Sequence, residues 1–294
     1  MLHETVLKRG RDAVPQWLAT HWPLVIGVAS LLLPTLLSLA EQHWSIEAGA
    51  HAPLVLVTGG WLVWRELQVD HRAPRPGSFV VSVGVLLPSL VLYVFGRAYD
   101  YLSLEAAGLY AAVLTIIYSR TGSGTLKDLW FPLLYLAFAI PFPGWALDVV
   151  TTPLKDIASS VTTSILQGFG LPVAREGVTL YVAQYQLLVE DACAGLNSII
   201  GLMSMGLFYT YIVHGSSPRY CMLLASFILP IAVFANVIRV MILVLLTYYA
   251  GDEVAQGFLH EGAGLVTFGS ALLLVFAVDS ALSRLVRPRV ATTA

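Results

Sequence analysis

The sequence predicts an all-α polytopic membrane protein that forms a single integral membrane domain over residues 1–294, and three observations predict this class. Hydrophobic residues make up 57% of the chain and charged residues only 12%, whereas a soluble domain carries about 25% charged residues. The mean hydropathy is +0.77. Apolar runs near the length of about 20 residues that spans a bilayer recur along the chain. Basic residues occur in small scattered groups rather than in a stripe, so nucleic-acid binding is not expected.

Eight apolar segments are expected to be transmembrane helices. They cover residues 22–40, 51–66, 78–97, 103–120, 128–147, 192–213, 220–249 and 263–283. The second segment is short and the fourth carries Glu105 near its start, so these two differ most from a typical span.

The first apolar segment also has features of a secretory signal peptide. Lys8, Arg9 and Arg11 precede it, and Ser38-Leu39-Ala40 resembles a cleavage site. However, the charged lead is long, Pro34 interrupts the apolar run, and more spans follow. An uncleaved first helix is therefore the favoured interpretation.

The basic residues orient these spans, because Lys and Arg concentrate in cytoplasmic loops. With both termini in the cytoplasm, only Arg97, Lys155 and Arg175 fall in outer loops, and Arg239 lies within a span. The other twelve fall inside: Lys8, Arg9, Arg11, Arg65, Arg72, Arg75, Arg120, Lys127, Arg219, Arg284, Arg287 and Arg289. The pattern predicts a multipass protein of the cytoplasmic (inner) membrane with cytoplasmic N- and C-termini.

The longest outer segment covers residues 148–191. Its first part, "TTPLKDIASSVTTSILQGFG", spaces apolar residues at helical intervals and predicts a short amphipathic helix on the outer surface. The next part, "LPVAREGVTLYVAQYQLLVED", has two β-prone runs around Gly177 and predicts a hairpin-like element before Cys193. "RTGSGTLKD" is read as a cytoplasmic connector.

Arg239 is an ionisable residue inside a predicted span, which costs about 2.5–3.5 kcal/mol and marks a functional site by default. It lies roughly 15 Å below the outer end of its helix. Asn236 precedes it by three residues, on the same helical face. The structural alternative is a buried anchor that pairs with a carboxylate. The candidate carboxylates all lie at outer helix ends: Glu190, Asp191, Asp252, Glu253 and Glu261.

Cys193 lies at the outer end of the sixth predicted span and Cys221 at the inner end of the seventh. Because the two cysteines are on opposite faces of the membrane, they cannot form a disulfide. A lone cysteine in a membrane helix is usually a small apolar filler, and position alone does not distinguish that role from a nucleophile. Glu190 and Asp191 would raise the pKa of the Cys193 thiol, so a nucleophile here needs a nearby cation. His260, in the outer "GFLHEGAG", is either ordinary surface or the base. Cys193, His260 and Arg239 together offer a thiol, an imidazole and an oxyanion donor.

Three motifs in order, "ACAGLNS", "NVIRV" and "LHEGAG", resemble those of the exosortase/archaeosortase family of membrane transpeptidase-like enzymes. The likeness covers residues 129–264 and includes "AFAIPFPGWALDVVTTPLK" and "GLPVAREGVTLYV". Ala194 departs from the family pattern, which commonly has serine there. The resemblance implies N-terminal spans over 1–127, a catalytic core over 128–264, and a last span with a basic tail over 265–294.

The resemblance also implies a site and an activity. The catalytic residues would be Cys193, Arg239 and His260, and the supporting residues are Asn236, Asn197 and Glu190. The implied enzyme is a cysteine peptidase or transpeptidase that acts through a Cys193 thioester, without cofactor or metal. Its protein substrates would end in a short motif, a membrane helix and a basic tail. Cleavage would take place at the outer face of the membrane, followed by transfer to an amine, an envelope glycan or a lipid nucleophile, or by hydrolysis.

Two other classes of function stay open. One is a transporter, with Asn236 and Arg239 lining a polar path, although the inner halves of the spans contain few polar residues. The other is a non-catalytic scaffold for envelope polysaccharide. Serine and zinc intramembrane proteases are disfavoured, because the chain has no Gly-x-Ser-x-Gly and no His-Glu-x-x-His.

Overall fold

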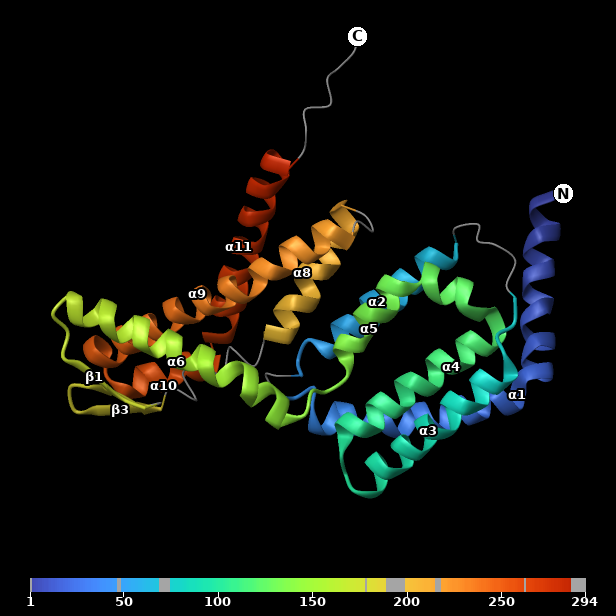
Figure 1. Ribbon diagram of the computed structural model, residues 1–294, viewed down its shortest axis with the longest axis horizontal. Helices are drawn as coiled ribbons and strands as arrows, with labels where there is room; N and C mark the ends of the chain where they lie inside the picture. The colour runs from blue at the N-terminus through green and yellow to red at the C-terminus, as the bar shows by residue number, and fades with distance from the viewer. Residues whose placement is uncertain are drawn as a thin grey trace, which may run out of the picture. The chain divides into compact units, whose positions relative to one another are not determined.

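The computed structural model is mostly helical, with one small sheet (Figure 1). It describes residues 2–46, 49–68, 75–177, 179–188, 199–214, 218–261 and 263–286. The chain divides into two compact units. The first comprises Met1–Gln42 and His71–Lys127, and the second comprises His43–Asp70 and Asp128–Ala294.

The first unit contains α1 (Leu2–Gln42), α3 (Phe79–Ala98) and α4 (Leu102–Asp128). Two glycines let the backbones of α3 and α4 approach closely. A Cβ atom added at Gly96 would lie 2.3 Å from the backbone nitrogen of Glu105, and one at Gly108 would lie 2.6 Å from that of Tyr93. Small residues are the usual means of close helix packing in membranes.

A buried carboxylate joins the three helices of the first unit. Glu105 is 3% exposed. Its Oε1 accepts hydrogen bonds from the Thr35 hydroxyl at 2.8 Å and from Arg97 Nη1 at 3.2 Å. Arg97 Nη1 also donates to Ser38 Oγ at 2.7 Å. A buried charge needs such partners. These hydrogen bonds explain how a carboxylate is accommodated at Glu105, near the start of a predicted span.

The second unit begins with α2 (Ala52–Leu67), which packs with α5 (Trp130–Leu136), η1 (Ala137–Ala139) and α8 (Ile199–His214). Aromatic rings fill this contact. Phe131 stacks on Tyr211 with centroids 3.9 Å apart, and Tyr135 stacks on Phe208 at 5.5 Å. The Tyr211 hydroxyl also donates to Glu66 Oε1 at 2.6 Å.

The predicted span over residues 128–147 is interrupted. The helical segment ends at Ala139, and α6 (Gly144–Gly168) leaves at 89° to it. Pro141 and Pro143 lie in the break. Proline removes a backbone donor and disfavours helix at the preceding residue, so two prolines in three residues end the helix and turn the chain.

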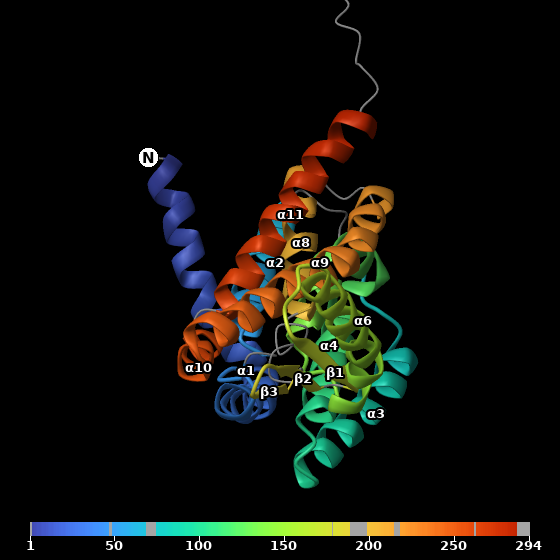
Figure 2. The ribbon, with the colours of Figure 1, turned by 90° about the vertical axis from the view of Figure 1, so that its left-hand side faces the viewer.

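The remainder of the second unit is built around α9 (Pro218–Ala250), with α6, α10 (Asp252–Glu261) and α11 (Ala263–Val286) packed against it (Figures 1 and 2). Where the sequence predicted a hairpin-like element, the structure has a three-stranded antiparallel sheet in the order β1-β2-β3. Its strands are β1 (Val173–Glu176), β2 (Thr179–Val182) and β3 (Tyr185–Leu188).

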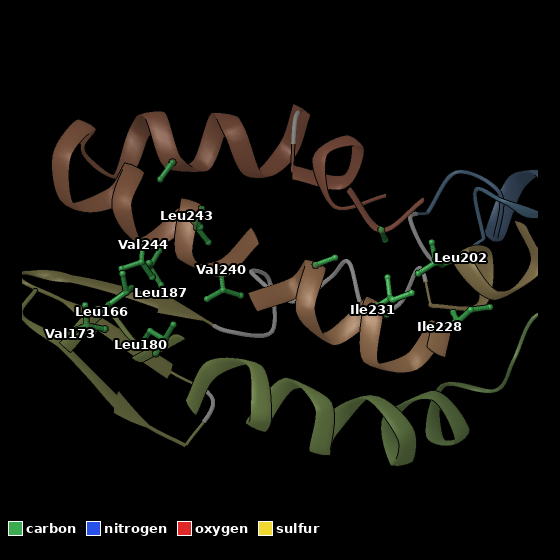
Figure 3. Close-up of a cluster of buried hydrophobic side chains, with 14 of the residues drawn as sticks. Leu166, Val173, Leu180, Leu187, Leu202, Ile228, Ile231, Val240, Leu243 and Val244 are labelled. Atoms are coloured by element: carbon green, nitrogen blue, oxygen red, sulfur yellow. The ribbon is translucent and has the colours of Figure 1, made fainter. Parts of the chain in front are cut away.

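One face of this sheet joins the hydrophobic core of the second unit. Leu180 and Leu187 lie in one cluster with Leu166 of α6 and with Val240 and Val244 of α9 (Figure 3). The alternation of buried and exposed residues along β2 follows the period of two in a strand. The sheet is therefore fixed against α6 and α9.

The number of spans is smaller than predicted among the described residues. Four helical segments are long and apolar enough to cross a membrane: Trp22–Gln42, Phe79–Ala98, Leu102–Asp128 and Met222–Ala250. The bent pair Trp130–Ala139 and Gly144–Gly168 adds a fifth if it is one span. The described apolar parts of α8 and α11, Ile200–Val213 and Gly269–Leu282, are shorter, and α2 has 16 residues. The count of eight spans is not confirmed.

Candidate active site

Helix α9 carries the described part of the candidate site. Its sequence is apolar nearly all round, as is typical of a helix that others surround. It ends before Gly251, whose φ of 92° suits only glycine without strain. Asn236 is fully buried and Arg239 is only 2% exposed. The two residues are three positions apart, so they share one face of the helix, and neither is exposed to lipid.

Helix α6 turns an unusual face toward the interior. Its buried positions are mostly polar: Thr151, Lys155, Ala158, Ser159, Thr162, Thr163 and Leu166. Its exposed large hydrophobic residues are Trp145, Val149, Val150, Ile157, Val161 and Ile165. The exposed face also carries polar residues, among them Asp148 and Asp156, so the distinctive feature of α6 is that its buried face is mostly polar.

The polar face of α6 reaches α9 close to Asn236 and Arg239. Thr162 Oγ1 donates to the backbone oxygen of Val237 at 3.5 Å. The sequence predicted a helix over residues 151–170, and most of that range is helical in α6. What the prediction missed is that the polar face is buried. The available signal was the spacing of Thr151, Lys155, Ser159 and Thr162, which share one helical stripe.

Cys193 lies outside the described residues, as do Glu190 and Asn197. The two elements that flank the 189–198 segment are described, however. On one side β3 ends at Leu188, and Leu187 is buried against α9. On the other side α8 begins at Ile199, and a Cβ atom added at Gly201 would lie 3.0 Å from the Cβ of His51. Both ends of the segment that contains Cys193 are thus anchored in the second unit.

His260 lies in α10, and its side chain is outside the described residues. Helix α10 follows α9 after Gly251 and packs against it, with Ala255 fully buried. A Cβ atom added at Gly251 would lie 4.0 Å from the hydroxyl of Tyr185 in β3. The structure therefore brings together three elements: α9 with Arg239, α10 with the backbone of His260, and β3, which leads into the Cys193 segment.

Two histidines, His43 and His51, precede α2, and His51 lies against Gly201 near the start of α8. His51 Nε2 is 3.1 Å from the backbone oxygen of Phe138. Burial, with a smaller contribution from the charge of His51, lowers the pKa of His43. No local pattern could have placed His51 next to the start of α8, because about 150 residues separate them in the chain.

The described residues offer no metal site, since no group of three or more His, Cys, Asp and Glu among them could hold an ion. A cavity of about 230 Å³ in the first unit is lined by Val81, Val85, Ala111, Leu114, Thr115, Tyr118 and Leu126. It contains no carboxylate, imidazole, thiol or basic group, so the candidate site stays with α9.

Comparison with known proteins tests the resemblance. The family model described as transmembrane exosortase (Exosortase_EpsH) matches residues 43–277. The match is wider than the motifs indicated and includes Cys193, Arg239 and His260. No curated protein and no solved structure matches the chain. Because the family model covers most of a helical chain with several candidate membrane spans, this multipass membrane protein belongs to the transmembrane exosortase family.

Proposed function

We propose that this exosortase is a cysteine transpeptidase that cleaves C-terminal sorting signals of exported, membrane-tethered proteins. Family membership supports a role in protein sorting in general. The observation that carries the specific proposal is the burial of Arg239 on α9, the helix against which both α10 and the sheet that leads into Cys193 pack. A guanidinium at this position supplies the cation that a thiolate beside Glu190 and Asp191 requires.

The reaction is acyl transfer. The Cys193 thiolate attacks the carbonyl carbon of the scissile peptide bond, and Arg239 stabilises the developing oxyanion. The C–N bond breaks as the His260 imidazolium protonates the leaving amine, which leaves a thioester on Cys193. An amine, a glycan or lipid hydroxyl, or water then attacks the thioester and passes its proton to His260. The C–S bond breaks and the thiolate is regenerated.

The substrate's membrane helix explains why the thiol lies where a charged segment meets an apolar one. A sorting signal with a motif, an apolar helix and a basic tail has its cleavage point at the membrane surface, with the tail in the cytoplasm. The start of α2, the end of η1 and the start of α8 meet around His51 and Phe138. The basic residues of the loops predict the starts of α2 and α8 for the outer side, which supports an extracytoplasmic site.

A reporter for sorting tests the proposal. An exported domain is fused to the C-terminal segment of a protein of the same organism that ends in a motif, an apolar helix and a basic cluster. Wild-type enzyme should shorten this reporter, as seen by its mobility on a gel, whereas Cys193→Ala and His260→Ala should leave it intact. Cys221→Ala and His51→Gln are the matched controls and should process it normally. Full processing by Cys193→Ala would overturn the proposal.

A second candidate, a transporter or an assembly scaffold for envelope polysaccharide, is favoured by one observation. The buried face of α6 is polar over several turns and lies against α9, as the wall of a polar path would. This function needs no thiol chemistry. It predicts that Cys193→Ala keeps its activity and that Cys193 reacts with a membrane-impermeant maleimide no differently when Arg239 or His260 is replaced.

A further inference from the structure

We propose that an extended part of the sorting signal binds as a fourth strand along the outer edge of β3. This inference rests on the proposed function, because the strand's occupant is the protein substrate. Addition of a strand to a sheet edge is a general mode of peptide recognition, in which backbone hydrogen bonds give affinity and alternate side chains give specificity.

The register of the sheet identifies the backbone groups that face outward. Val182 pairs with Tyr185 across a two-residue turn in which Ala183 has a φ of 52°. Pairs next to such a turn exchange both hydrogen bonds, and the pairs along the ladder then alternate. Tyr185 and Leu187 therefore bond to β2, while the N–H and C=O of Gln186 point away from it. Gln186 is exposed and forms no hydrogen bond with the other described residues.

The opposite edge of the sheet is partly occupied. By the same alternation the outward groups of β1 include those of Val173, whose oxygen accepts from Gln167 Nε2 at 2.8 Å and whose N–H donates to Leu171 at 2.9 Å. Arg175 holds β1 on α6 through Asp156 Oδ1 at 2.7 Å and Ser159 Oγ at 2.9 Å. The β1 edge is therefore partly covered, whereas no described residue bonds to the outward backbone groups of Gln186 on the β3 edge.

The position of β3 connects this edge to the reaction. β3 ends at Leu188, five residues before Cys193, a distance of at most about 18 Å along an extended chain. Leu180 and Leu187 fix the sheet in the core, so its edge is preorganised and binding does not have to order it. Tyr181 lies opposite Gln186 and is exposed on the same face. Gln186, on the edge strand itself, would be the cross-strand neighbour of a side chain of the bound motif.

Replacement of one backbone N–H tests the pairing. Gln186→Pro removes an outward donor without removing a bond of the β2–β3 ladder, and edge strands tolerate proline at such positions. Gln186→Thr is the matched control, because it changes the side chain and keeps the N–H. With the fusion reporter as the probe, Gln186→Pro should slow processing at least tenfold, and Gln186→Thr should stay within twofold of wild type. Alkylation of Cys193 by a small maleimide does not require pairing of a peptide with β3. An alkylation rate of Gln186→Pro equal to that of wild type therefore shows that the fold is intact.

Cross-linking gives a second measurement that does not depend on tolerance of proline. In a variant that carries Cys193→Ala and Cys221→Ala, the substitution Gln186→Cys supplies the single cysteine. This variant is oxidised in the presence of a set of reporters, each with one cysteine at a different position of the motif. A paired strand predicts disulfides at every second reporter position, because side chains alternate between faces. Cross-linking without this period, or wild-type processing by Gln186→Pro, would overturn strand addition and leave the thiol chemistry standing. Processing by Cys193→Ala would instead overturn the proposed function.

Discussion

Arg239 is the residue that connects the sequence to the chemistry. Its guanidinium is buried in a mostly apolar helix, about 17 Å from the helix end at Ala250. A single charged side chain at this depth is costly unless the surroundings are polar. Thr162, on the buried polar face of α6, reaches α9 at the backbone oxygen of Val237, two residues before Arg239.

Replacement of Arg239 should affect the reaction more than the fold. Arg239→Ala is expected to lower the rate of reporter processing by about 10²–10³-fold, since loss of one oxyanion donor costs about that much. Arg239→Lys keeps the charge but loses the planar fork of donors, so an intermediate rate is expected. Ser226→Ala, an exposed position on the same helix, is the control. A normal initial rate for Arg239→Ala in membranes that contain equal amounts of protein would contradict the role given to it.

His43 should make the stability of the second unit depend on pH. Burial lowers its pKa below the ordinary 6.5, so the folded protein binds fewer protons than the unfolded chain just below that pH. The linkage relation then gives a loss of stability as the pH falls below about 6.5 and no loss above it. The melting temperature in detergent should fall between about pH 7.5 and pH 5.5, and His43→Gln should reduce that fall. An equal fall in the variant would assign the effect to other groups.

At the scale of elements, the closest helix contact in the first unit depends on glycine. Gly96→Ala would place a Cβ atom 2.3 Å from the backbone of α4, which forces the two helices apart. Gly84, in the same helix, has nothing within 4 Å of an added Cβ atom. We therefore expect Gly96→Ala to lower the melting temperature in detergent. Gly84→Ala should be neutral or slightly stabilising, because alanine is the better helix former. Equal effects of the two substitutions would argue against this packing.

The sequence predicted the long, uniformly apolar elements well, because hydropathy alone determines them. The spans predicted at 78–97 and 220–249 agree closely with Phe79–Ala98 and Met222–Ala250. The sequence did not predict the break in the helix around Pro141 and Pro143. The composition there is apolar, but the backbone turns by 89°. A window of hydropathy averages over such a turn, and proline is also common within membrane helices, so neither signal locates it.

At the scale of the whole molecule, three short motifs predicted the family, and the family model extends the likeness to residues 43–277. The burial of Asn236 and Arg239 could be anticipated, because polar groups within a span avoid lipid. For the buried polar face of α6 the spacing of its polar residues was the one local signal, and for the approach of His51 to α8 there was none. Both depend on contacts between segments far apart in the chain, and one sequence contains no record of such contacts.

The central claim is that the sulfur of Cys193 carries the cleaved substrate as a thioester. Membranes that hold the enzyme and the fusion reporter are quenched in acid, and the enzyme is separated without reducing agent. Acyl transfer through Cys193 predicts a covalent adduct of enzyme and reporter that neutral hydroxylamine releases, that maps to the peptide with Cys193, and that is absent from Cys193→Ala. Processing without such an adduct, or an adduct that persists in Cys193→Ala, would contradict it.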